Sequence, residues 1–198
     1  YTAAIREDNP EFAAAKEKGI PMLSRAELLG QIMDNYQNSI AVSGTHGKTT
    51  TTSMISQILL AAKKDPTITV GGILKAIDGN LRVGKSDVFI SEACEYTNSF
   101  LNFRPKYSII LNIEAEHLDF FKDIHDIRNS FHLFAKNTKE NGAIIINGEI
   151  ENYQEIVEGL APQVITYGMS DACDFYPADI MHYFKWAFIV TAVGLALG

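Results

Sequence analysis

Residues 41–50 read AVSGTHGKTT, and this stretch constrains the fold more than any other part of the chain. A short, apolar, β-prone run precedes it at 39–42, and apolar residues recur at helical spacing after it, from 49 to 62. A strand, a turn that ends in Gly-Lys-Thr and an amphipathic helix, in this order, are typical of a phosphate-binding loop. The alternative, a glycine turn followed by a Thr-rich helix cap, leaves the coincidence of the three features unexplained.

The residue types in this loop suit the binding of a nucleotide. Glycines let backbone N–H groups turn toward a phosphate, and the start of the following helix adds partial positive charge. Lys48 can reach the outer phosphates, and the hydroxyl of Thr49 can complete the coordination of Mg²⁺. For His46, shaping the turn and contacting the nucleotide are equal alternatives. The predicted nucleotide-binding residues are Gly44, Thr45, His46, Gly47, Lys48, Thr49 and Thr50.

Length and composition exclude several classes of protein. A chain of 198 residues with 46% hydrophobic content can bury a substantial core. A net charge of −7 without any Lys/Arg run argues against a nucleic-acid partner or an anionic membrane surface. Cys94 and Cys173 lie far apart and lack metal or redox spacing, as expected of free thiols in a reducing cytosol. We therefore expect a globular, cytoplasmic protein.

The order of apolar segments predicts an α/β fold with a mostly parallel sheet and helices on both faces. Residues 39–180 form the predicted P-loop-type central domain, and residues 1–38 the end of a preceding Rossmann-like α/β domain. In 1–38, Asn9 and Pro10 open one helix, and a capping box from Ser24 to Glu27 opens another. The candidate strands are 39–42, 67–70, 88–92, 107–112, 143–147 and 164–167, and the candidate helices in the central domain are 49–62, 124–137 and 151–159.

Polar motifs follow two of these strands where each strand ends. The strand at 88–92 leads into EACEY at 92–96, and the strand at 107–112 leads into NIEAEHLD at 112–119. Because ligands gather beyond the carboxyl ends of parallel strands, Glu95 and His117 can join Lys48 and Thr49 in holding a metal that bridges ATP phosphates. The alternatives are a solvated acid for Glu95 and a helix-capping role for His117.

Three motifs, GTHGKTT at 44–50, EACEY at 92–96 and NIEAEHLD at 112–119, together resemble the Mur ligases. The loop is also similar to that of the folylpolyglutamate synthases, and both groups are ATP-dependent amide-forming enzymes. The likeness covers about residues 1–180. It implies that 1–38 is the C-terminal part of a UDP-binding N-terminal domain and that 39–180 is an incomplete central ATP-binding domain.

The resemblance implies a cytoplasmic ligase that joins L-alanine to UDP-N-acetylmuramate through an acyl phosphate, with ATP and Mg²⁺ as cofactors. Such an enzyme serves peptidoglycan synthesis and, through it, cell wall biogenesis, cell shape and cell division. Two alternatives remain, a ligase of the same family that recycles murein tripeptide and an ATP-binding fragment without catalysis.

The resemblance also implies individual roles. Lys48, Glu95 and His117 would be catalytic: Lys48 would contact the ATP phosphates, Thr49 and Glu95 would ligate one Mg²⁺, and His117 would ligate a second. Cys94 stands where many relatives have Asp. The pair at 71–72, Gly-Gly, is either an ordinary turn or a family loop near the substrate.

The last part of the chain, 181–198, is an apolar tail of a different character. Its apolar run is shorter than the ~20 residues needed to span a bilayer, so it can also be a buried strand or helix. From Met181 it resembles the opening of an unrelated membrane protein. We therefore expect a truncated or joined sequence near residue 180, and membrane association only if the tail is native.

Overall fold

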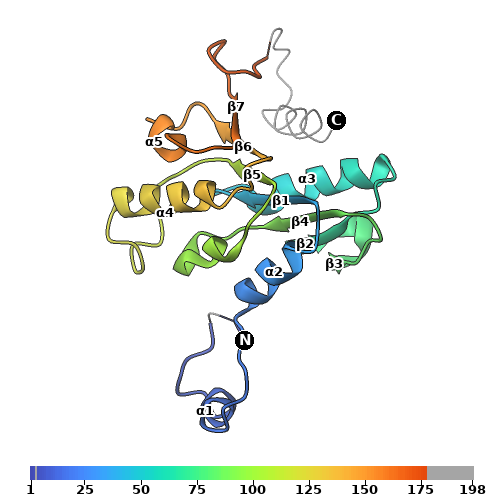
Figure 1. Ribbon diagram of the computed structural model, residues 1–198, viewed down its shortest axis with the longest axis vertical. Helices are drawn as coiled ribbons and strands as arrows, with labels where there is room; N and C mark the ends of the chain where they lie inside the picture. The colour runs from blue at the N-terminus through green and yellow to red at the C-terminus, as the bar shows by residue number, and fades with distance from the viewer. Residues whose placement is uncertain (3, 178–198) are drawn as a thin grey trace.

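The computed structural model describes residues 1–2 and 4–177. A seven-stranded sheet forms the centre of this part of the chain (Figure 1). The strand order is β3-β2-β4-β1-β5-β6-β7, and all neighbouring strands are parallel except β2 and β3. The predicted α/β fold with a mostly parallel sheet is confirmed. The strands are β1 Asn38–Ser43, β2 Thr67–Leu74, β3 Gly79–Arg82, β4 Val88–Glu92, β5 Tyr107–Ile110, β6 Ala143–Asn147 and β7 Gln163–Tyr167.

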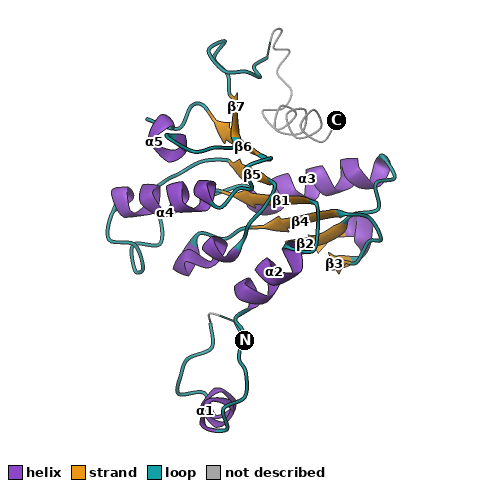
Figure 2. Cartoon of the chain, in the orientation of Figure 1, coloured by secondary structure: helices purple, strands orange, loops and turns teal. Residues whose placement is uncertain are grey.

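Two apolar clusters, one on each face of the sheet, form the core. Successive side chains of a strand point to opposite faces, so Ile40 and Val42 of β1 join one cluster and Ala41 joins the other. The first cluster includes residues of α3 (Lys48–Ala61), and the second includes residues of α4 (Ile124–Lys136). Helices therefore cover both faces (Figure 2), which explains why the central strands read as continuous apolar runs.

The second cluster also anchors α2 (Arg25–Met33) and the 3-10 helix η2 (Tyr96–Asn102) to the sheet. The ring of Phe100 in η2 stacks on Phe134 of α4 with centroids 4.8 Å apart. A Cβ on Gly30 of α2 would lie 2.1 Å from the carbonyl oxygen of Asn102. Only glycine permits this close approach, which places α2 beside the end of η2.

The first helix, α1 (Pro10–Glu17), lies apart from the sheet and has no buried residue (Figure 1). Its N-cap is Asn9, whose side chain accepts from the N–H groups of Glu11 and Phe12. The predicted capping box of α2 is present, with Ser24 and Glu27 bonded to each other's backbone N–H groups. The division into domains at residue 38 stays a prediction.

Several expected element boundaries are wrong. The pair at 71–72 lies inside β2, not in a turn, because β2 continues to Leu74 and pairs with β3, an antiparallel edge strand that the sequence did not reveal. The 3-10 helix η1 (Lys75–Ile77) connects these two strands. The helix expected at 151–159 is reduced to α5 (Gln154–Val157), because Asn152 has a φ of 50°, which is incompatible with a right-handed helix.

The apolar tail at 181–198 lies outside the described residues, so the expectations about it stay predictions. Within residues 1–2 and 4–177, no helix combines the length and the apolar character needed to cross a bilayer.

The aromatic contacts of α4 are expected to contribute to the stability of the fold. Phe131 is fully buried against the ring of Phe100, so Phe131→Ala is expected to lower the free energy of unfolding by about 3–5 kcal/mol. Leu133→Ala is the matched control, since Leu133 lies on the same helix but is 39% exposed; its effect is expected to stay within about 1 kcal/mol. Urea unfolding followed by circular dichroism measures both. Equal losses in the two variants would contradict the assigned packing.

Candidate active site

The loop between β1 and α3 has a backbone shape that its glycines permit. Gly44 has a φ of 137° and Gly47 a φ of 83°, in the region that favours glycine. A Cβ on Gly44 would lie 2.9 Å from the Cβ of Leu111, so the loop passes directly against the residues after β5. Gly47 is the N-cap of α3 and supplies no side-chain cap. The uncapped N-terminus of α3 therefore presents N–H groups and partial positive charge, as phosphate binding requires.

The three residues predicted to be catalytic meet beside this loop. Glu95 is only 2% exposed, and the Nζ of Lys48 donates to its two carboxylate oxygens at 3.1 and 3.0 Å. The Nε2 of His117 lies 3.5 Å from Glu95 Oε1. Lys48 Nζ also donates to the carbonyl oxygens of Gly44 at 2.6 Å and Thr45 at 3.1 Å. Because a buried carboxylate is costly without a cationic partner, Glu95 depends on Lys48.

Tyr96 supports His117 in an unusual backbone conformation. His117 has a φ of 55°, and its ring centroid lies 4.7 Å from that of Tyr96. The Tyr96 hydroxyl donates to Asp119 Oδ2 at 2.9 Å, and this hydrogen bond to a carboxylate raises the pKa of Tyr96. A left-handed residue other than glycine needs support from its surroundings. Tyr96 provides it by contacting the turn at two points.

Glu92 is a site residue that the sequence reasoning missed. Thr49 Oγ1 donates to Glu92 Oε2 at 3.0 Å, and the backbone N–H of Gly71 donates to Glu92 Oε1. Glu92 is the last residue of β4, and β4 lies next to β1 in the sheet, so its side chain emerges beside the loop. Its place in the motif at 92–96 was visible in the sequence. Its contact with Thr49 depends on the strand order.

The other predicted loop residues have different positions. The Oγ1 of Thr45 accepts from the backbone N–H of Glu114 at 2.9 Å. The His46 ring is largely exposed, with Nε2 3.6 Å from Glu114 Oε2 and 3.3 Å from Glu116 Oε1. Thr50 is exposed on the first turn of α3 and is not part of the Lys48 cluster. The structure therefore places Thr45 and His46 against the residues after β5, whereas Thr50 is exposed on α3.

The donor set beside the loop suits a magnesium ion carried by a nucleotide. The hydroxyl of Thr49 and the carboxylates of Glu92 and Glu95 are oxygen donors, which Mg²⁺ prefers. In the described part of the chain, no group of three or more His, Cys, Asp or Glu residues is arranged to hold a metal. Mg²⁺ in nucleotide sites takes few protein ligands and completes its shell with phosphate oxygens and water. The residues present therefore fit Mg²⁺ in that form.

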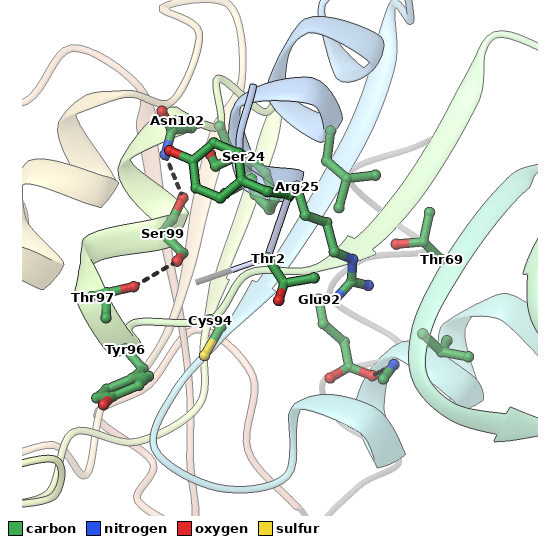
Figure 3. A pocket seen from close by; sticks show the side chains of 16 residues that line it. Thr2, Ser24, Arg25, Thr69, Glu92, Cys94, Tyr96, Thr97, Ser99 and Asn102 are labelled. Atoms are coloured by element: carbon green, nitrogen blue, oxygen red, sulfur yellow. Dashed lines mark hydrogen bonds between the residues drawn. The ribbon is translucent and has the colours of Figure 1, made fainter. Parts of the chain in front are cut away.

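A cavity of about 490 Å³ adjoins the loop on the side of α2 and η2 (Figure 3). Its walls come from Tyr1, Thr2 and residues between 24 and 29, from the middle of β2, from the carboxyl end of β4, and from η2 and its flanks. Figure 3 shows Arg25 extending from α2 toward Glu92 and Thr69, with the sulfur of Cys94 at the cavity wall. Glu92 thus contacts the phosphate loop and also lines the neighbouring cavity. Glu92 therefore connects the loop to the cavity.

The structure agrees with the motif resemblance: the loop lies on a parallel sheet, and the Lys48–Glu95 pair and His117 lie at the same edge. The chain belongs to the Mur ligase family. A family model described as Mur ligase middle domain matches residues 42–192, and one described as Mur ligase family, catalytic domain, matches residues 1–37. The chain is 75% identical over 182 residues to the UDP-N-acetylmuramate–L-alanine ligase of Agathobacter rectalis. That alignment covers 92% of this chain and 40% of the relative, so the chain spans less than half of the relative's length.

Solved structures of two ligases share the fold. The UDP-N-acetylmuramate-alanine ligase of Thermotoga maritima matches with a TM-score of 0.71 and 30% identity, over 84% of this chain and 37% of that one. The UDP-N-acetylmuramate:L-alanyl-gamma-D-glutamyl-meso-diaminopimelate ligase of Neisseria meningitides matches with a TM-score of 0.85 and 24% identity, over 98% of this chain and 72% of that one. The resemblance to the Mur ligases is confirmed. The roles of the individual site residues stay predictions.

The alkylation rate of the Cys94 thiol is expected to depend on the charge of Glu95. Partial burial of the thiol and the negative charge of Glu95 raise the pKa of Cys94. Because the thiolate is the reactive form, iodoacetamide is expected to alkylate Cys94 slowly at pH 8. Glu95→Gln removes the charge, lowers that pKa and is expected to speed alkylation about two- to fivefold. Peptide mass spectrometry measures the rate at Cys94 separately from that at Cys173.

Glu158→Gln is the control for this measurement, since Glu158 is exposed beyond α5 and does not contact the loop. Its alkylation rate at Cys94 is expected to equal that of the unmodified chain. A slower rate in Glu95→Gln than in Glu158→Gln would refute the electrostatic coupling.

Proposed function

We propose that this chain is the nucleotide-binding part of an ATP-dependent ligase that joins L-alanine to UDP-N-acetylmuramate in the cytoplasm. The observation that carries the proposal is the contact of Lys48 with the buried Glu95 at the mouth of a phosphate loop. The identity of 75% to the ligase of A. rectalis supports the choice of reaction.

In this proposal, the loop binds the phosphates of ATP. Lys48 exchanges its backbone carbonyl partners for oxygens of the outer phosphates, and the N-terminus of α3 adds its partial charge. Thr49 and Glu95 would hold one Mg²⁺ ion, and His117 would hold a second. When bound, Mg²⁺ supplies positive charge that neutralises the transferring phosphoryl group. Glu92 orients the Thr49 hydroxyl through their hydrogen bond.

The reaction proceeds in two displacements. A carboxylate oxygen of UDP-N-acetylmuramate attacks the γ-phosphorus of ATP, and ADP leaves as the acyl phosphate forms. The amine of L-alanine then attacks the acyl carbon, phosphate leaves, and the nitrogen loses a proton as the amide forms. Neither step requires a covalent bond to the protein. The residues of this chain therefore act by positioning the phosphates and by neutralising their charge.

The cavity beside Glu92 is the proposed place for the sugar-acid substrate. Glu92 lines it and accepts a hydrogen bond from Thr49 of the loop, so a carboxylate bound there would lie close to the phosphates. Arg25 extends into this space (Figure 3) and supplies a guanidinium group that can pair with a carboxylate. Cys94 lines the same wall.

Two other functions remain in competition. The first is a ligase of the same family that adds a tripeptide in place of L-alanine, as the name of the Neisseria ligase with the same fold states for that protein. The span of 40% of the A. rectalis relative favours ATP binding without turnover by these 198 residues alone. The acceptor used by the natural gene product distinguishes the first alternative from an L-alanine ligase. ATP turnover by this chain distinguishes the second alternative from a catalytic role.

Binding of ATP with Mg²⁺ to this chain tests the role of the loop. Lys48→Ala removes the cation that contacts the phosphates, so affinity is expected to fall at least about tenfold, as for the loss of a charge-assisted hydrogen bond. Isothermal titration calorimetry measures the dissociation constant. Thermal unfolding is followed in parallel, because the variant leaves Glu95 without Lys48.

Lys64→Ala is the matched control, since Lys64 is exposed beyond the other end of α3. It carries the same change of charge, and its affinity for ATP is expected to be unchanged. Equal affinities for a folded Lys48→Ala variant and for Lys64→Ala would refute the assignment of this loop to phosphate binding.

Phosphate release by the natural gene product tests the reaction. With UDP-N-acetylmuramate and ATP present, release is expected to depend on L-alanine and to be slow with the tripeptide. His117→Ala removes a proposed metal ligand and is expected to lower kcat about 100-fold or more, since metal charge stabilises the transferring group by several kcal/mol. His125→Ala, an exposed histidine on α4, is the control. Release that depends on the tripeptide alone would favour the alternative ligase.

A further inference from the structure

We propose that Asn112 is a positioning residue that sets the shape of the phosphate loop through its side-chain amide. The inference rests on the proposed role of the loop in binding ATP. Asn112 Oδ1 accepts from the backbone N–H of His46 at 2.8 Å, and Asn112 Nδ2 donates to the carbonyl oxygen of His46 at 3.1 Å. One side chain therefore satisfies both backbone polar groups of a single loop residue, as a neighbouring strand would.

Backbone contacts reinforce this attachment. The N–H of Thr45 donates to the carbonyl oxygen of Asn112 at 3.2 Å, and the N–H of Leu111 donates to the carbonyl oxygen of Ser43 at 3.0 Å. The N–H of Glu114 donates to Thr45 Oγ1 at 2.9 Å. The segment after β5 thus lies along one side of the loop, and the other side is left for a ligand.

The two hydrogen bonds of Asn112 fix the peptide groups on both sides of His46. In a trans peptide group, the C=O and the N–H point in opposite directions. Because the His46 N–H points to Asn112, the Thr45 carbonyl points away from it, where Lys48 Nζ donates to it at 3.1 Å. Because the His46 carbonyl points to Asn112, the N–H of Gly47 is likewise directed away from Asn112. Asn112 therefore orients an N–H group toward the side of the loop where Lys48 lies.

This arrangement requires a side chain with one donor and one acceptor in the same plane. An amide has both, whereas a carboxylate has two acceptors and would set an oxygen against the His46 carbonyl. A protonated carboxylic acid again has one donor and one acceptor. The chemistry of the contact therefore predicts a dependence on pH for Asn112→Asp that a purely space-filling role would not produce.

The test compares the affinity for ATP with Mg²⁺ of Asn112→Asp and of the unmodified chain between pH 5 and pH 8. At pH 8 the variant is expected to bind about tenfold more weakly, as for the loss of one or two hydrogen bonds. The His46 carbonyl oxygen disfavours a carboxylate at this position, so the pKa of the new carboxyl group is expected to lie above the usual ~3.9 of Asp. As the pH falls and this group takes up a proton, the ratio of the two affinities is expected to return toward one. The charged groups nearest this contact, His46, Glu114 and Glu116, are present in both proteins and in Asn112→Ala, so a change in the ratio that Asn112→Ala does not show arises from the new carboxyl group.

Two further variants distinguish the possible outcomes. Asn112→Ala has neither donor nor acceptor, so its loss of affinity is expected to be the same at every pH. Asn137→Asp makes the same chemical change where the amide donates to the carbonyl oxygen of Leu101 at 2.9 Å, away from the loop. Its affinity for ATP is expected to equal that of the unmodified chain throughout. Thermal unfolding verifies that each variant is folded at each pH.

The results separate this inference from the proposed function. If Lys48→Ala loses ATP binding but Asn112→Asp binds normally at pH 8, the role of Asn112 is refuted and the loop assignment stands. A loss in Asn112→Asp that does not depend on pH, equal to that of Asn112→Ala, also refutes it. If a folded Lys48→Ala variant binds as tightly as the unmodified chain, the loop assignment itself fails.

Discussion

The buried carboxylate of Glu95 is the constraint on which the rest of the site depends. An acid that is 2% exposed requires a cationic partner, and Lys48 provides it from another segment of the chain, while the imidazole of His117 contacts the same carboxylate from a third segment. These residues follow β4, β1 and β5, which are neighbours in the sheet. The strand order therefore creates the site: it places three carboxyl ends side by side and lets one charge interaction tie them together.

The parts of the structure that could be predicted from the sequence are those encoded locally. Gly44, Gly47 and Lys48 are close in sequence, so their loop was recognisable, and the continuous apolar runs indicated strands covered on both faces. Glu95 and His117 were expected near Lys48 only through the general rule that parallel strands end at one edge of a sheet. The structure agrees with that expectation, since the three side chains meet.

The parts that could not be predicted depend on strand order and on contacts across the sequence. Asn112 bonds to a residue 66 positions away, and Glu92 to a residue 43 positions away. No periodicity marks such pairs. The edge strand β3 has the sequence GNLR, without the alternation that predicts a strand. It forms along the edge of β2 opposite β4, where β2 offers backbone groups that an antiparallel partner satisfies.

The short segment that follows β5 carries two functions at its two ends. Asn112 binds the loop, and His117, in a left-handed conformation, reaches Glu95. The segment therefore acts as a spacer of fixed length. An insertion or a deletion of one residue would shift either the amide away from the loop or the imidazole away from the carboxylate, even if every side chain in the site were kept. Divergence within this segment is thus limited in length as well as in residue identity.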